Sequence, residues 1–259
     1  MPDYLDVLAR DAKETIRTGY YQVPTQNVES SVSLRKAIIE NRQNAVITEV
    51  KAASPSRGTI KSGFNPAEVA RAMQNGGATG ISVLTEPKHF SGSLSYLANV
   101  RESVKLPILM KDIIINQIQL ESASRIGANI VLLIVALFQR EYCECSLDEM
   151  VSKAHAKNLE VLLETHSENE FQQAIETDAD LVGINNRDLG TLKVDLQITK
   201  RIMKNRESKC KVVVSESGIM TASDLRFLRG CGAQAFLIGS AVMMADNIEK
   251  KVREFVIAN

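Results

Sequence analysis

The feature that most constrains the fold is an alternation of short apolar runs with longer segments of helical periodicity. Eight runs are rich in β-branched residues and continuously apolar, which is typical of strands buried on both faces of a parallel sheet. These runs are 45–50, 80–85, 107–111, 129–135, 159–164, 180–185, 211–216 and 235–240. Strands that alternate with helices in this number predict an α/β fold, a closed (β/α)8 TIM barrel, with a doubly wound open sheet as the alternative.

Helical segments separate the runs, and several begin with a capping residue followed by acidic residues. The predicted helices include 66–74, 115–126, 147–157, 168–176, 222–229 and, at the end of the chain, 246–257. Residues 1–44 contain two amphipathic segments, which predict an N-terminal helical extension packed on a barrel of residues 45–259. Because no low-complexity linker divides the chain, we expect residues 1–259 to form a single domain.

Composition excludes several function classes. The 31 Lys and Arg residues equal the 31 Asp and Glu residues, so no net positive charge favours nucleic-acid binding. The longest apolar stretch, 130–138, is too short for a membrane-spanning helix, and the acidic N-terminus lacks the features of a secretory signal. We therefore expect a cytoplasmic protein without nucleic-acid or membrane partners, and the sequence leaves a monomer and a weak homo-oligomer open.

Metal and cofactor chemistry have little support in the sequence. Cys143 and Cys145 form a Cys-x-Cys pair, but no second pair or nearby histidine completes a tetrahedral site, so free thiols are expected. His89, His155 and His166 share no ligand spacing. His166 follows the fifth strand, where it either lines the barrel mouth or starts a helix. Without a Walker loop or a G-x-G-x-x-G fingerprint, we expect neither a metal nor a cofactor.

Charged and polar residues gather where the predicted strands end. The active site of a parallel barrel is built at these carboxyl ends. Glu49 and Lys51 are two positions apart on the first strand, so both point to the interior. Burying unpaired charges is costly, so this collection predicts paired groups that perform chemistry, although a purely structural salt bridge is the alternative for Glu49 and Lys51. The other strand-end residues are Lys111, Asp112, Glu164, Asn185, Asn186, Arg187, Glu216 and Ser217.

Small residues after the last two strands predict a phosphate site. Barrels often bind phosphate with the loops after strands seven and eight and the N-terminus of a short helix. Ser-Gly-Ile at 217–219 follows the seventh strand, and Gly-Ser-Ala at 239–241 follows the eighth. Gly218 and Gly239 permit close backbone approach, and Ser240 adds a hydroxyl donor. The two segments together predict a phosphorylated small-molecule substrate.

These stretches resemble the indole-3-glycerol phosphate synthase family. The most specific is E-x-K-x-x-S-P-S-x-G from Glu49 to Gly58, whereas the Gly-Ser-Ala motif that ends at Ala241 is shared by many barrels. The order of the stretches is the family's order, and the N-terminal helices fit its extension. The other matching stretches are SVLTE at 82–86, FSGS at 90–93, LMKD at 109–112, LETH at 163–166, GINNRDL at 183–189, SESGI at 215–219 and LIGSA at 237–241.

The resemblance implies a lyase of tryptophan biosynthesis that converts 1-(2-carboxyphenylamino)-1-deoxyribulose 5-phosphate into indole-3-glycerol phosphate, with loss of CO2 and water. It implies that Lys111 is the principal general acid at the substrate carbonyl and that Glu164 is the second acid/base carboxylate. Lys51 and Glu49 would assist proton transfer. Phosphate would be bound by Gly218, Gly239 and Ser240, and the rest of the substrate by Ser54, Asn185, Arg187, Glu216 and Ser217. Within that set, Ser54 would contact the anthranilate carboxylate, and Glu216 would also position the acid/base groups.

The residue types suit this chemistry on physical grounds. Ring closure needs a proton donor at a carbonyl, decarboxylation needs a positive environment, and dehydration needs acid and base together. A lysine near other cations and partly buried is expected to have a lowered pKa, which favours donation near neutral pH. Ile113 stands where the family commonly has Phe, so the packing around the substrate ring is expected to differ.

Two other interpretations stay open. Another phosphosugar barrel, such as phosphoribosylanthranilate isomerase, needs an acid/base pair but not the Ser-Pro-Ser loop, and an aldolase would form a Schiff base on Lys111 or Lys51. A non-catalytic binding partner that keeps a phosphate pocket is disfavoured, because a relic site would be expected to lose its costly buried charges.

Overall fold

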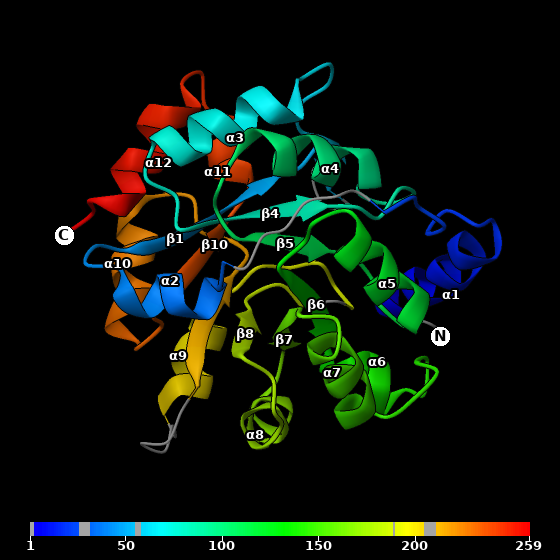
Figure 1. Ribbon diagram of the computed structural model, residues 1–259. Coiled ribbons are helices and arrows are strands. Elements are labelled where there is room, and N and C mark those ends of the chain that lie inside the picture. Colours follow the sequence, from blue (N-terminus) through cyan, green and yellow to red (C-terminus); the bar gives the residue numbers. More distant parts are fainter. Residues whose placement is uncertain (1–2, 26–31, 55–57, 189, 205–210) are drawn as a thin grey trace.

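A closed barrel of parallel strands forms the centre of the computed structural model, which describes residues 3–25, 32–54, 58–188, 190–204 and 211–259, without the side chain of residue 54. The strands are β1 (Ala45–Val50), β4 (Gly80–Leu84), β5 (Ile108–Lys111), β6 (Ile130–Ile134), β7 (Glu160–Thr165), β8 (Leu181–Asn185), β9 (Val212–Glu216) and β10 (Ala235–Ile238). They follow one another around the barrel in chain order, and β10 pairs with β1 to close it (Figure 1). The barrel prediction is confirmed, and the open sheet is excluded.

Helices surround the strands, as the periodicity predicts (Figure 1). They are α3 (Pro66–Asn75), α4 (Leu94–Ser103), α5 (Gln117–Arg125), α6 (Val135–Gln139), α7 (Leu147–His155), α8 (Glu168–Glu176), α9 (Gln197–Lys204), α10 (Ala222–Gly230), α11 (Ser240–Met243) and α12 (Ile248–Val256). The sequence analysis missed the short hairpin of β2 (Ala53–Ser54) and β3 (Gly58–Thr59) after β1. It also extended two strands too far, because Val135 and Ser240 each begin a short helix.

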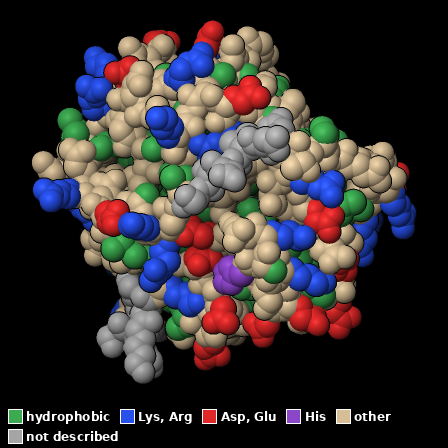
Figure 2. Space-filling view, in the orientation of Figure 1, with side chains coloured by type: hydrophobic (Ala, Val, Ile, Leu, Met, Phe, Trp, Pro, Cys, Tyr) green, Lys and Arg blue, Asp and Glu red, His purple; other side chains and the backbone are tan. Residues whose placement is uncertain are grey.

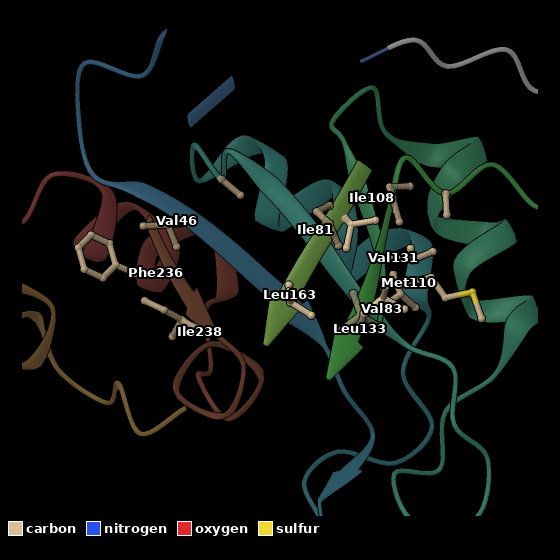
Figure 3. Packing of buried hydrophobic residues seen from close by; sticks show 14 of the residues in the cluster. Val46, Ile81, Val83, Ile108, Met110, Val131, Leu133, Leu163, Phe236 and Ile238 are labelled. Atoms are coloured by element: carbon tan, nitrogen blue, oxygen red, sulfur yellow. The ribbon is translucent and has the colours of Figure 1, made fainter. Parts of the chain in front are cut away.

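Alternation along each strand divides the core into two layers. The outward residues of the strands pack beneath the helices, and Figure 3 labels ten of them, among them Met110, Leu163 and Phe236. The neighbouring residues Leu109 and Leu162 point inward and belong to a second cluster inside the barrel. This alternation puts the last interior position of several strands at the barrel mouth, where the sequence carries Lys or Glu.

The N-terminal extension consists of α1 (Tyr4–Arg17) and α2 (Leu34–Glu40), which cover opposite ends of the barrel. Leu5 and Leu8 of α1 pack into the interior cluster at the carboxyl ends of the strands. At the other end, the backbone N–H of Leu34 donates to Glu160 at the start of β7 over 2.8 Å. The prediction that the extension packs on the barrel is confirmed.

The surface has a mixed charge. Lys and Arg side chains and Asp and Glu side chains both occur over the face seen in Figure 2, where the acidic ones gather along the lower edge, and the totals of 31 basic and 31 acidic residues are equal. Across the described ranges, none of the helices has the length and apolar character needed to cross a membrane.

Candidate active site

A cavity of about 420 Å³ opens at the carboxyl ends of the strands. Most of the predicted site residues line it, from six different strands or the segments that follow them. They are Glu49, Lys51, Lys111, Glu164, Asn185, Arg187, Glu216, Ser217, Gly218 and Ser240. Gly239 lies beside the cavity, because a side chain at this position would meet the carboxylate of Glu49. Ser54 belongs to β2, but its side chain lies outside the described part of the structure.

Lys111 lies between two buried carboxylates at the centre of this site. Its Nζ is 2.7 Å from Oε2 of Glu216 and 3.2 Å from Oε2 of Glu164. The two glutamates end or nearly end β9 and β7, and both point into the barrel. Glu164 is held on its other oxygen by Asn185, whose Nδ2 donates to Oε1 over 3.0 Å. One cation therefore joins side chains from strands on both sides of the mouth.

The electrostatics of Lys111 differ from the sequence expectation. Burial lowers its pKa, but the carboxylates of Glu216, Glu164 and Glu49 outweigh burial and hold the pKa above its ordinary value. The expectation of a lowered pKa is wrong, because the groups that face this lysine are anions rather than cations. Burial raises the pKa of Glu216 to about 7. Burial also opposes ionisation of Glu164, but Lys111 and His166 overcome it and hold the pKa of this carboxyl below its ordinary range.

Glu49 and Lys51 form a second ion pair on the cavity wall. Their side chains are only 3% and 15% exposed, and Gly239 leaves the space that they occupy. Spacing along β1 predicts this common orientation, and the structure confirms it. The alternative of a purely structural salt bridge also predicts this ion pair. Both groups nevertheless line the cavity, where they would contact a bound molecule.

The segment after β9 has an uncommon backbone conformation. Ser217 and Gly218 both have left-handed backbone angles, with φ of +66° and +83°. A side chain at position 218 would meet Val194, so this position needs glycine for space as well as for conformation. Ser240, which follows the neighbouring strand β10, is the first residue of α11.

The polar residues of the segment after β8 are divided between the cavity and the core. Arg187 lines the cavity, its backbone N–H donates to Asn185, and its Nη1 donates to the carbonyl of Leu192 over 2.9 Å. Asn186 is buried and bonds instead with Ser215 and Thr199. The side chain of Asn186 therefore stabilises the fold rather than lining the cavity. Alternation along the strand explains why Asn185 faces the cavity and Asn186 does not.

Sequence reasoning missed the apolar half of the cavity wall. Four of its residues come from α1 and from the loop after β4: Tyr4, Leu5, Leu8 and Phe90. Nothing in the sequence of α1 indicates which end of the barrel it covers. Leu132, Ile134 and Leu237 are interior strand positions that alternation could have identified. Ile113, the departure noted in the sequence, lies in this wall and is almost fully buried.

Groups for metal binding are not assembled here. Among the residues that the structure describes, no cluster of three or more His, Cys, Asp or Glu side chains could hold a metal ion. Cys143 and Cys145 are free thiols outside the cavity wall.

These features define a class of protein: a (β/α)8-barrel enzyme whose site combines lysine and glutamate acid/base groups. Solved structures support the fold. The N-acetylmannosamine-6-phosphate 2-epimerase from Clostridium perfringens matches with a TM-score of 0.61 at 15% identity, covering 83% of this chain and 93% of that one. A thiamine phosphate pyrophosphorylase from Pyrococcus furiosus gives 0.60 at 19% identity, covering 86% and 96%.

Sequence comparison identifies the family. The family profile for indole-3-glycerol phosphate synthase matches residues 6–255. The indole-3-glycerol phosphate synthase of Methanocaldococcus jannaschii is 45% identical over 229 residues, which cover 86% of this chain and 83% of that protein. That of Acetivibrio thermocellus is 39% identical over 249 residues, covering 96% and 94%. The chain belongs to the indole-3-glycerol phosphate synthase family, as its motifs predict.

Proposed function

We propose that this cavity converts 1-(2-carboxyphenylamino)-1-deoxyribulose 5-phosphate into indole-3-glycerol phosphate, CO2 and water, a carbon–carbon lyase reaction of tryptophan biosynthesis. Membership of the family supports the reaction. The observation that carries the assignment of residues is the position of Lys111, whose ammonium faces the cavity while two buried glutamates hold its charge.

Ring closure uses Lys111 as the general acid. The aromatic carbon that bears the carboxylate attacks the ketone carbon, and the ammonium donates a proton to the ketone oxygen as that oxygen becomes a hydroxyl. The raised pKa of Lys111 keeps it protonated at neutral pH. Glu216 and Glu164 hold the ammonium in place at the cavity, so it needs no reorganisation before it reacts.

Decarboxylation and dehydration complete the sequence. The bond from the ring to the carboxylate breaks, CO2 leaves, and the electron pair restores the aromatic ring. Lys51, held by Glu49, then protonates the departing hydroxyl, while Glu164 removes a proton from the carbon next to nitrogen. Two protons are donated and one is taken up by Glu164, so each turnover consumes one proton from solvent, which matches the loss of a carboxylate as CO2.

The remaining site residues bind the substrate. The turn at Ser217 and Gly218 and the segment at Gly239 and Ser240 would hold the phosphate with backbone N–H groups and a hydroxyl. Asn185 and Arg187 would contact the sugar and its anionic groups. Ser54 would contact the anthranilate carboxylate, and the apolar wall from α1 would cover the ring.

The wider setting follows from the same proposal. The enzyme would act in the cytoplasm as a monomer or weak homo-oligomer on a phosphorylated small molecule, without nucleic-acid or membrane partners. Its balanced charge supports the absence of nucleic-acid binding. Residues 1–259 would form a single domain, because the interior cluster joins α1 and α2 to the barrel strands.

The test of this function is the appearance of indole fluorescence when the purified protein meets the substrate. The chain contains no Trp, so product emission stands clear of protein emission. Lys111→Ala should lower kcat by about 10²- to 10⁴-fold, the usual contribution of a general acid. Lys36→Ala is the matched control, because Lys36 is 73% exposed on α2 at the other end of the barrel.

Two outcomes would contradict the proposal. Absence of indole product from a folded wild-type protein would contradict the proposed synthase activity. Trapping of substrate on Lys111 or Lys51 by borohydride would favour an aldolase. Circular dichroism of each variant separates loss of chemistry from loss of fold.

A further inference from the structure

His166 lies directly behind Glu164, and the proposed chemistry gives it no part. It follows β7 and precedes Ser167, the residue that caps α8. Nε2 of its ring lies 3.3 Å from Oε1 of Glu164, and Nδ1 lies 3.5 Å from Oε2 of Glu170. The side chain is 14% exposed and is absent from the cavity wall. The ring therefore contacts Glu164 without lining the substrate space.

The imidazole is fixed by its own surroundings. Oε2 of Glu170 accepts a hydrogen bond from the backbone N–H of His166 over 2.8 Å, and the same oxygen faces the ring. Each ring nitrogen faces one carboxylate, and the two carboxylates together hold the ring. A ring placed between two carboxylates is best accommodated as an imidazolium.

The charges around His166 favour its protonated form. Burial lowers the pKa of His166, but Glu164 and Glu170 outweigh burial and raise it to about 9. Asp188, in the segment after β8, also interacts with its charge. On the far side, Lys111 contacts the other oxygen of Glu164. At neutral pH, Glu164 is thus flanked by a cation on each of its two oxygens.

We propose that His166 is a positioning residue: as an imidazolium it keeps Glu164 ionised and oriented as the base of the reaction. This inference rests on the proposed function. Lys111 loses its proton during ring closure in that scheme, so its charge disappears from beside Glu164 before the base is needed. Within the described structure, the cations at ion-pair distance from Glu164 are Lys111 and His166. His166 supplies the charge that persists through the step.

The first test is the pH dependence of kcat/KM for His166→Asn. Without the imidazolium, the pKa of Glu164 should rise, because burial would be opposed by fewer charges. The acidic limb of the profile should move up by about one pH unit, with a loss of about tenfold in activity on that limb. Glu216 titrates in both proteins, so the difference between the two profiles isolates Glu164.

His155→Asn is the matched control. His155 also contacts a carboxylate, with Nε2 2.9 Å from Oδ2 of Asp180, but it is 38% exposed at the end of α7 and away from the cavity. Its profile should superimpose on that of the wild type. Glu170→Gln is a second variant, and it leaves the His166 ring in place. Without the charge of Glu170 the imidazolium is less favoured, so the acidic limb of the profile should shift in the same direction by less.

A measurement without turnover completes the test. Titration of the Glu164 carboxyl by ¹³C NMR, assigned with Glu164→Gln, should show a higher pKa in His166→Asn than in the wild type. Imidazole added to His166→Ala should restore activity in the acidic range. An unshifted Glu164 titration, or a loss of kcat that is equal at every pH, would overturn the role of His166. Absence of product from the wild type would instead contradict the proposed function and leave the NMR result to decide on His166.

Discussion

At the scale of single residues, the charged site depends on a position without a side chain. Gly183 on β8 points into the barrel, and a Cβ there would collide with Oε1 of Glu216. Glu216 is 1% exposed, and Oε2 of the same carboxylate contacts Lys111. The glycine thus makes room for the carboxylate that holds Lys111, a relation between neighbouring strands that one strand's sequence does not reveal.

Gly183→Ala should therefore displace Glu216 and loosen its 2.7 Å contact with Lys111. We expect kcat to fall by about tenfold or more, with an overpacking cost of about 1–3 kcal/mol in the free energy of unfolding. Kinetics and denaturant unfolding measure the two effects. Gly230→Ala is the control, because a Cβ at Gly230 has open space around it. A wild-type kcat in Gly183→Ala would show that catalysis does not depend on the present position of Glu216.

At the scale of elements, α1 forms part of the cavity wall and is fastened to the loop after β4. His89 bridges two residues of the helix: Nδ1 lies 3.0 Å from the Tyr4 hydroxyl and Nε2 lies 2.7 Å from Oδ2 of Asp11. Lys88 adds an ion pair to Asp11 over 3.3 Å. Tyr4 lines the cavity, so the same contacts that dock the helix also place a wall of the site.

Asp11→Ala should weaken this docking and raise KM several-fold while kcat changes by less than about twofold. The wall contacts ground state and transition state alike, and loss of such uniform binding appears in KM. Steady-state kinetics measure the split. Glu14→Ala on the same helix is the control, since Glu14 is 57% exposed and its carboxylate pairs with Arg17 at 3.8 Å. Equal loss in kcat would indicate that α1 acts on the chemistry itself.

The contrast between strands and α1 explains how far the sequence could be interpreted. Glu49, Lys111 and Glu164 were located at one mouth because strand alternation and parallel connectivity are local rules that fix both face and end. The position of α1 depends on which barrel end its apolar face fits, which is a matter of tertiary packing. The direction of the pKa shift of Lys111 was predicted wrongly for the same reason: the nearest charges come from β7 and β9, distant in sequence.

At the scale of the whole molecule, the interior cluster connects the extension to the barrel. Leu5 and Leu8 of α1 and Leu34 of α2 pack in the same cluster as inward strand residues such as Leu109. Each end of the barrel would expose apolar surface without its helix. We therefore expect the extension and the barrel to unfold in one transition, as a single cooperative unit.

The tyrosines allow this to be measured. Of five in the chain, three lie in the extension (Tyr4, Tyr20 and Tyr21), and the Tyr142 hydroxyl donates to Asp6 of α1 over 3.0 Å. In Tyr96→Phe, every remaining tyrosine therefore belongs to the extension or contacts it, so near-ultraviolet circular dichroism reports its docking, while the far-ultraviolet signal reports the barrel. The two thermal midpoints should coincide within about 1 °C. Loss of the tyrosine signal at a lower temperature would contradict this expectation. It would show that residues 1–44 unfold separately from the barrel and are less stable than it.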